Sequence, residues 1–156
     1  MFLAFRLATP ADQPDIERLV LAAFEPITWQ KKLDARFGPL NGHDWQARWR
    51  QRLEKIFATQ IVLVGETASG ELAAVATATI DREAKLGFID VLAVSRDQQG
   101  QGLGRAMLRA AMEHLRSLGC QYVNLDCLTD NESGNALYAS EGFAEVARHV
   151  RWFRKI

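Results

Sequence analysis

Hydrophobic positions in the first third of the chain change from strand-like to helix-like spacing. Residues 3–7 alternate between apolar and polar, which predicts a short strand. Thr9, Pro10 and Asp12 then suit the N-cap, the first and the third position of a helix. The apolar stripe of that helix consists of Ile16, Leu19, Val20 and Ala23. A second amphipathic helix is predicted over residues 44–58, with Trp45, Trp49, Leu53 and Ile56 on one face.

Residues 25–42 interrupt this pattern, because prolines and glycines recur among them. A connection of this length in a compact domain is often a binding loop, although a short helix over residues 30–37 would shorten it. Trp29, inside this connection, either lines an acceptor pocket or holds the loop against the core.

The second half of the chain predicts mostly strands. Residues 61–66, 71–80 and 86–94 form a predicted meander, and a helix over residues 105–118 stops at Gly119. A strand at 122–127, a short helix at 133–140 and a final strand at 144–154 complete the order βααβββαβαβ. We therefore expect an α/β fold with a mixed central sheet and helices on both faces. The final strand alternates only partly, which suits a sheet edge or a contact with a second copy in a homodimer.

Composition narrows the class of protein. The chain has 156 residues, about one domain, and its 48% hydrophobic and 24% charged residues are typical of a globular fold. Nineteen basic residues balance nineteen acidic ones, so we expect neither a nucleic-acid nor a membrane partner. The histidines stand apart without metal-ligand spacing, so we expect no metal.

The termini and cysteines bear on localisation. The apolar start, residues 1–5, is too short for a signal peptide, and no run approaches the length of a membrane span. Cys120 and Cys127 would lie about 20 Å apart along the predicted strand, too far for a disulfide, and free thiols suit a reducing compartment. We expect residues 1–156 to form a single cytoplasmic domain.

The most informative segment is a glycine-rich turn that joins the strand 86–94 to the following helix. Gly100, Gly102 and Gly104 permit positive φ and leave no Cβ between the main-chain N–H groups and a ligand. A helix start also exposes unpaired N–H groups and the positive end of the helix dipole. These features predict a cradle for phosphate.

Two known phosphate-binding loops match this turn poorly. The P-loop requires Lys and then Ser or Thr after its last glycine, but Arg105 follows Gly104 here. The dinucleotide pattern begins at Gly100 and Gly102 but has Arg105 in place of its third glycine. Asp126, at the end of the next predicted strand, suits a ribose-binding acid, so a dinucleotide-dependent oxidoreductase stays an alternative.

Gln99-x-x-Gly102-x-Gly104 resembles the acetyl-CoA-binding loop of the GNAT superfamily of N-acetyltransferases, Q/R-x-x-G-x-G/A. A second segment, Asn131-x-x-Gly134-x-x-Leu137-Tyr138-x-x-x-Gly142-Phe143, is similar to that family's N-x-x-A-x-x-L-Y-x-x-x-G-F pattern, with Gly134 in place of the usual Ala. The strand Ile89–Val94 is similar to the family's central strand. The predicted element order matches along nearly the whole chain.

The resemblance implies a role for each matching residue. The main-chain N–H groups of the turn would hold the pyrophosphate of CoA, together with Arg105. The main chain of Leu92 and Val94 would pair with the pantetheine arm, Asn131 would bind the arm nearby, and Tyr138 would protonate the departing thiolate. The full set of cofactor-binding candidates is Leu92, Ala93, Val94, Gln99, Gly100, Gln101, Gly102, Leu103, Gly104, Arg105 and Asn131.

Acyl transfer to an amine needs a neutral amine, an oxyanion stabiliser and a proton for the leaving sulfur. Asp90 is the first candidate base, acting through water, and Glu83 is the second. A phenol of pKa about 10 can protonate a thiolate whose conjugate acid has a pKa near 8.5. No nucleophilic side chain is required, although Cys127, near the predicted cofactor, leaves a covalent route open.

Each candidate residue also has a structural interpretation. Tyr138 alternatively belongs to the core, Asp90 is solvated or pairs with an arginine on a neighbouring strand, and Asn131 caps the helix that follows it. The sequence thus predicts an acetyl-CoA-dependent N-acetyltransferase whose acceptor is a small-molecule primary amine. A lysine or N-terminal amine of a protein is the alternative, and an acyl-CoA sensor without activity is a lesser one.

Overall fold

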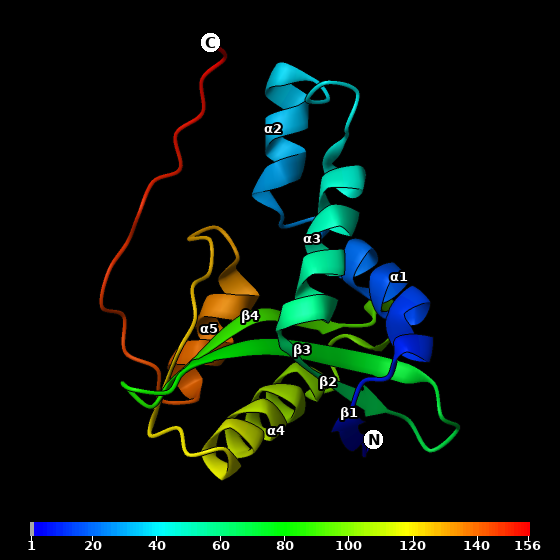
Figure 1. Ribbon diagram of the computed structural model, residues 1–156, viewed down its shortest axis with the longest axis vertical. Coiled ribbons are helices and arrows are strands. Elements are labelled where there is room, and N and C mark those ends of the chain that lie inside the picture. The colour runs from blue at the N-terminus through cyan, green and yellow to red at the C-terminus, as the bar shows by residue number, and fades with distance from the viewer. Residues whose placement is uncertain (1) are drawn as a thin grey trace.

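The fold is built on one five-stranded sheet, described here in a computed structural model that covers residues 2–156 (Figure 1). The strands are β1 (Ala4–Leu7), β2 (Ile61–Glu66), β3 (Leu72–Asp81), β4 (Leu86–Val94) and β5 (Tyr122–Asn124). They lie in the sheet in chain order, antiparallel from β1 to β4, and β5 joins β4 in parallel. This mixed sheet confirms the expected α/β fold class.

Helices cover both faces of the sheet. They are α1 (Gln13–Phe24), α2 (Trp29–Phe37), α3 (Trp45–Thr59), α4 (Leu103–Ser117) and α5 (Glu132–Ser140), with short 3-10 turns η1 (Pro10–Asp12) and η2 (Arg96–Gln98). Helices α1 and α3 lie on one face and α4 on the other, whereas α2 projects beyond the sheet (Figure 1).

Local chemistry at the helix starts follows the sequence. The carboxylate of Asp12 accepts a hydrogen bond from the Thr9 N–H at 2.7 Å, so the chain enters η1 and then α1. Helix α2 forms within residues 25–42, capped by Thr28, whose hydroxyl accepts from the Gln30 N–H at 3.3 Å. The predicted short helix at 30–37 is therefore confirmed.

Two apolar clusters hold the layers together. The stripes of α1 and α3 pack against alternate residues of β2, β3 and β4, including Val64, Val75 and Val91. Met107, Leu108 and Leu115 of α4 pack against the opposite side of the same strands. Strands β3 and β4 are consequently covered on both faces, which places the segment leading into the glycine turn on a rigid support.

A β-bulge interrupts β4 near its centre. Thr77 of β3 pairs with Val91 and Ala78 pairs with Ile89, so Asp90 has no partner in the register. The Thr77 hydroxyl accepts a hydrogen bond from the Val91 N–H at 3.2 Å, which compensates one main-chain donor at the irregularity. The pairing of β4 with β5 covers only Leu86–Phe88, just before the bulge.

Two sequence predictions about the last third of the chain are wrong for this structure. Strand β5 ends at Asn124 instead of residue 127, because β4 no longer pairs with it beyond Phe88. The predicted final strand at 144–154 has no strand structure, and the segment runs away from the sheet (Figure 1). A strand needs hydrogen-bonding neighbours, which alternation of residue types alone does not supply.

Candidate active site

The glycine turn between η2 and α4 has an open, left-handed backbone. Gly100 and Gly102 have φ values of 81° and 77°, and a Cβ added to either would meet no heavy atom within 4 Å. Gly102 is the N-cap of α4, so no side chain caps this helix. The space above the turn is therefore open to a ligand that approaches the main chain.

Main-chain donors gather at this turn. Within residues 2–156, the N–H groups of residues 100–105 donate no hydrogen bond to a protein acceptor. The first of the α4 N–H groups lie at the positive end of the helix dipole, where negative charge is stabilised by about 0.3–1 kcal/mol per interaction. The anion cradle expected from the glycines would need this arrangement of open backbone and unpaired donors.

The edge of β4 next to the turn is also available. The Ser95 N–H donates to the Ala73 carbonyl of β3 at 2.8 Å. Because main-chain groups alternate in direction along a strand, those of Val94 and Leu92 face the other way, past the end of β5. Within residues 2–156, the one hydrogen-bond partner at this edge is the Gln99 side chain, whose amide donates to the Val94 carbonyl at 3.3 Å. Ala93 faces β3 and is buried, so it lies outside this edge.

Tyr138 lies on α5 and packs into the apolar cluster under α4. Its ring contacts Phe143, with centroids 5.9 Å apart, and its hydroxyl forms no hydrogen bond within the described residues. Burial, and to a smaller extent the neighbouring Cys127, raises the pKa of Tyr138 to about 12. The phenol is therefore protonated at neutral pH and free to donate.

Helix α5 is held against α4 by an ion-pair cluster. Glu141, whose side chain is only 8% exposed, pairs with Arg105 and accepts two hydrogen bonds from Arg109, each at 2.9 Å. The pairing with Arg109, and then with Arg105, holds the pKa of Glu141 below its usual value. Arg105 is thus engaged by Glu141 while it borders the glycine turn.

Asp90, the bulged residue, lies under α3. Its two carboxylate oxygens accept hydrogen bonds from Arg52 at 2.5 Å and from Gln60 at 2.8 Å. The Arg52 guanidinium also stacks on the Trp49 ring, 4.5 Å from its centroid. The arginine partner proposed as an alternative for Asp90 therefore exists, on a helix instead of a strand.

Glu83 lies far from these groups. It occupies the exposed turn between β3 and β4, where its N–H donates to Asp81 at 3.1 Å. The glycine turn follows the opposite end of β4, nine residues long, or about 27 Å from end to end. The structure therefore does not bring Glu83 together with the turn.

A match to a protein-family model identifies the fold family. Residues 23–143 match the model described as "Acetyltransferase (GNAT) family", which spans both the glycine turn and Tyr138. The chain belongs to the GNAT family of acetyltransferases. The resemblance drawn from the two sequence motifs is confirmed.

Two named acetyltransferases are similar in sequence to parts of this chain. Glucosamine 6-phosphate N-acetyltransferase 1 of Oryza sativa subsp. japonica is 33% identical over 113 residues, 69% of this chain and 66% of that protein. Mycothiol acetyltransferase of Geodermatophilus obscurus is 41% identical over 69 residues, 44% of this chain and 22% of that protein. The matches span less than two thirds of the length of both relatives.

A solved GNAT structure agrees along the whole chain. The structure of AAC(6')-Iy in complex with the bisubstrate analog CoA-S-monomethyl-acetylneamine has a TM-score of 0.70 and 14% sequence identity, and the match covers 100% of both chains. At this identity the likeness shows the fold.

Asn131 has a structural role in this GNAT chain. Its side chain caps α5, since Oδ1 accepts from the Gly134 N–H at 3.2 Å. A Cβ at Gly134 would lie 2.6 Å from Asn131 Nδ2 and 3.1 Å from Cys127 Sγ. An alanine at this position would require the amide at the end of the Asn131 side chain to shift.

Cys127 does not have the properties of a nucleophile. Burial raises the pKa of its thiol, and the carboxylates of Asp126 and Asp130 add to that rise. The thiolate, not the thiol, is the reactive form. Direct transfer from the thioester to the amine is thus favoured over a covalent enzyme intermediate.

Sequence reasoning missed three side chains of the site. Arg52 follows Trp49 by three residues and so borders the apolar stripe of α3, a detectable signal. Gln60 and Glu141 carry no such signal, because their partners come from β4 and α4. These contacts arise only when the layers assemble.

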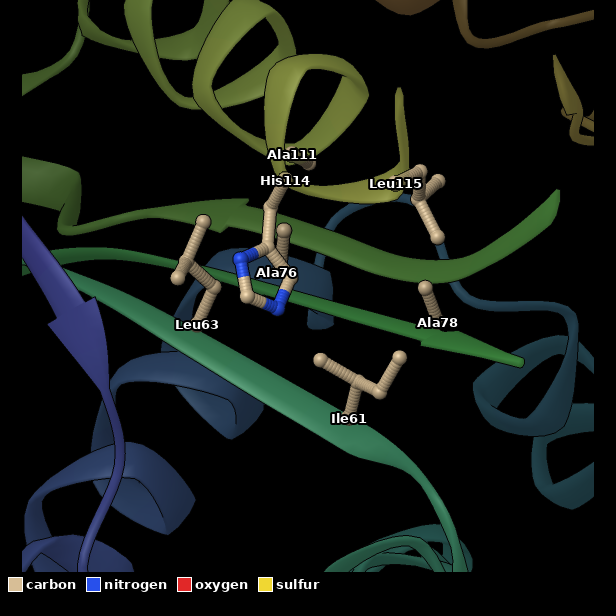
Figure 2. A pocket seen from close by; sticks show the side chains of 7 residues that line it. All are labelled: Ile61, Leu63, Ala76, Ala78, Ala111, His114 and Leu115. Atoms are coloured by element: carbon tan, nitrogen blue, oxygen red, sulfur yellow. The ribbon is translucent and has the colours of Figure 1, made fainter. Parts of the chain in front are cut away.

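Two cavities lie away from the glycine turn and Tyr138. Figure 2 shows the smaller, a gap of about 10 Å³ between β2, β3 and α4, where His114 lies over Leu63 and Ala76. It is apolar and no larger than the space needed for one water. The other, of about 280 Å³, lies between α1 and residues 95–97.

Neither a membrane-spanning helix nor a metal-binding cluster occurs in residues 2–156. No helix among them combines the length and apolar character needed to cross a bilayer. No cluster of three or more His, Cys, Asp or Glu side chains in this range is arranged to hold a metal ion.

Proposed function

We propose that this chain is an acetyl-CoA-dependent N-acetyltransferase that acetylates a small-molecule primary amine directly. One observation carries the proposal: the main-chain N–H groups of residues 100–105 donate no hydrogen bond within residues 2–156, and they lie beside the free edge of β4. Membership of the acetyltransferase family supports it.

The chain's groups fit acetyl-CoA by their chemistry. The turn offers several N–H donors and has no Cβ at Gly100 or Gly102, which suits the two charged phosphates of a pyrophosphate. The main chain of Leu92 and Val94 offers both donors and acceptors to an amide-containing arm in extended conformation. Bound acetyl-CoA supplies the thioester carbonyl that the amine attacks.

Tyr138 acts as the general acid in this proposal. A phenol with a pKa of about 12 is a weak acid, so its proton moves late, when negative charge has developed on sulfur. The hydroxyl is available because no protein acceptor holds it. Solvent then returns the proton to the phenolate.

Asp90 is the proposed base, acting through water. A carboxylate offers about four lone-pair sites, and Arg52 and Gln60 use two of them, so Asp90 retains acceptors for a water. Its place at the β4 bulge, four residues before Val94, brings it closer to the proposed acetyl position than Glu83. Water alone is the remaining route for the amine proton.

The choice of a small-molecule acceptor rests on the relatives. The Oryza sativa protein is named for glucosamine 6-phosphate and the Geodermatophilus obscurus protein for mycothiol, both small molecules. A lysine or N-terminal amine of a peptide is the alternative acceptor. We also propose that residues 1–156 work as one acetyltransferase domain in the cytoplasm.

Thermal unfolding with saturating acetyl-CoA, CoA or NAD tests the cradle first. At 100 times Kd a ligand adds about 2.7 kcal/mol, which for this size raises Tm by about 5–10 °C. We expect this rise with acetyl-CoA and CoA and none with NAD. Gly102→Val should abolish it.

Gly70→Val is the matched control for that variant. Gly70 has a φ of 85° and equally open space, but lies in the turn between β2 and β3. It should lower stability as much as Gly102→Val and leave the ligand-induced rise unchanged. A rise in Tm with NAD alone contradicts the proposal. The absence of a rise with every one of these ligands contradicts it as well.

A thiol-detection assay of CoA release then identifies the acceptor. Amino sugars, other small amines and peptides with free N-terminal or lysine amines are compared at equal concentration. Turnover with small amines supports the proposed acceptor class. Turnover with peptides alone replaces it with the alternative.

A further inference from the structure

The C-terminal tail, residues 144–156, runs past α2 and is held there by two of its side chains (Figure 1). Its main chain forms no hydrogen bond within residues 2–156. Phe153 contacts Phe37 with ring centroids 4.7 Å apart, and the Arg151 guanidinium lies 4.0 Å from the Trp29 ring centroid. Because side chains two residues apart face the same side of an extended chain, the two contacts together orient Arg151 toward α2.

The arginine on the Trp29 ring has no acidic partner. Arg148 of the same tail pairs with Glu145, and Arg105 pairs with Glu141. Arg151 forms neither an ion pair nor a hydrogen bond within residues 2–156, so its N–H donors are unused. A guanidinium placed over an aromatic ring keeps these donors at its edge, where they match the two oxygens of a carboxylate or a phosphate.

Two further donors lie on the first turn of α2. The indole N–H of Trp49 donates to Thr28 at 3.0 Å, whereas that of Trp29 donates to no acceptor in the part of the chain that the structure describes. Lys32 follows Trp29 by three residues and so lies on the same side of the helix. It pairs with Asp130, but both side chains are more than half exposed, and such a pair adds little stability. The Lys32 ammonium is therefore available to an anion.

The first turn of α2 is joined to both sides of the proposed active site. The ion pair of Lys32 with Asp130 joins it to the loop before α5, the helix that carries Tyr138. Glu25, just after α1, lies 3.6 Å from Arg96 of η2, next to the glycine turn. An acceptor whose amine lies near Tyr138 can therefore extend its other end toward the first turn of α2.

We propose that Arg151 binds an anionic group, a phosphate or a carboxylate, at the end of the acceptor opposite the reacting amine, and that Trp29 and Lys32 supply further donors. This inference rests on the proposed function and narrows its acceptor class to small amines that also carry a negative charge. The Trp29 ring holds the guanidinium in place before the acceptor arrives, so less side-chain freedom is lost on binding. A neutral amine leaves these donors unpaired.

Paired acceptors measure this preference at saturating acetyl-CoA. Glucosamine 6-phosphate is compared with glucosamine, and 6-aminohexanoate with hexylamine, so that the two pairs distinguish a phosphate from a carboxylate. In the parent chain, kcat/KM should be about tenfold higher for the anionic member of at least one pair, mainly through a lower KM. Arg151→Ala should reduce this ratio to about one. Arg148→Ala removes the tail arginine that is paired with Glu145 and should keep the ratio of the parent chain.

Calorimetric titration of the same four compounds in the presence of CoA tests the anion site without turnover. If no amine is acetylated, the proposed function fails, and binding alone decides on the anion site. At least one anionic compound should bind the parent chain and Arg148→Ala equally well, and Arg151→Ala about tenfold more weakly. Binding of neither anionic compound, equal binding of both members in both pairs, or equal values for Arg151→Ala and Arg148→Ala overturns the proposal.

Discussion

Two regions of the chain meet at the proposed active site, and they differ in how their main-chain groups are satisfied. In residues 61–118, β2, β3 and β4 pair with neighbours and are covered on both faces, so the glycine turn follows directly from a packed strand. In residues 119–156, β5 has three paired residues, α5 has no fully buried residue, and the tail is unpaired. The first region holds the proposed cradle rigidly, whereas the second carries Tyr138, the proposed acid, on a helix held by few contacts.

This difference predicts which property of the protein a substitution should change in each region. In the first region the geometry is imposed by the packed sheet, so single changes should affect ligand binding, stability or, at Asp90, proton transfer separately. In the second region Tyr138 depends on the Glu141 cluster and on Phe143, so changes there should affect turnover. Four substitutions test this contrast.

Tyr138→Phe should have the largest effect. Removing the proton donor lowers kcat by about 10³-fold, within the range for general acids, while acetyl-CoA still raises Tm. Tyr122→Phe, on an exposed tyrosine of the same region, should leave kcat unchanged. Equal activity of Tyr138→Phe and the parent chain would remove Tyr138 from the mechanism.

The pH dependence sharpens the same test. Because the pKa of Tyr138 is raised from its usual 10 to about 12, the acid stays protonated through pH 10. The stability linked to this group is complete below pH 10 and is lost as pH rises through 12. A fall in kcat between pH 8 and 10 that Tyr138→Phe abolishes would contradict the assignment.

Asp90→Asn should lower kcat by about 10²-fold and flatten the rise of kcat with pH, if Asp90 accepts the amine proton through water. Glu83→Gln, at the other end of β4, should change neither. Steady-state rates from pH 5 to 9 distinguish the two. An Asp90→Asn variant that loses stability but keeps the parent pH profile would show that Asp90 only fixes the bulge with Arg52 and Gln60.

Glu141→Gln should lower kcat about tenfold, because small misplacements of a catalytic group reduce rates strongly. Glu113→Gln is the control, since Glu113 pairs with Arg116 on the exposed face of α4, where such pairs contribute about 0–1 kcal/mol. The arginines lower the pKa of Glu141, so its stabilisation is present above its unfolded pKa and lost as pH falls through the folded one. The Tm difference between Glu141→Gln and the parent should therefore shrink below about pH 4.5.

Gly104→Ala should have the smallest effect and the opposite sign. Gly104 lies inside α4 at an ordinary φ, and an added Cβ would make normal contacts with Leu137 at 3.6 Å and Val94 at 3.7 Å. Replacing a helical glycine by alanine stabilises by about 1 kcal/mol, or about 2–4 °C in Tm. Acetyl-CoA should still bind, because the family pattern accepts alanine here; loss of binding would mean that the cradle extends further into α4 than the turn.

Local pattern was sufficient for the packed sheet and the helices that cover it. The apolar stripes of α1, α3 and α4 and the meander of β2, β3 and β4 followed from spacing alone, and the turn at Gly100 and Gly102 followed from residue type. The placing of Arg52, Gln60 and Glu141 did not, because each meets a partner from an element distant in sequence. Predicting those contacts requires the packing of α3 on β4 and of α5 on α4.

The last third shows the limit of pattern reading. Residues 122–127 and 144–154 have strand-like composition, but a strand forms only where a neighbour accepts its hydrogen bonds. The bulge at Asp90 ends the pairing with β5, and the tail is drawn to α2 by Phe153 and Arg151. Neither the bulge nor the contact of the tail with α2 can be predicted from the spacing of apolar and polar residues.

The sequence by itself determined the secondary-structure order of most of the chain, the motifs that mark the family, and the open backbone of the glycine turn, since these depend on short-range sterics and periodicity. Only the tertiary structure decided which groups around the turn are free. Hydrogen-bond partners are distributed when distant elements pack: Asp90 and Glu141 are engaged, whereas the Tyr138 hydroxyl, the β4 edge and the tail are left open.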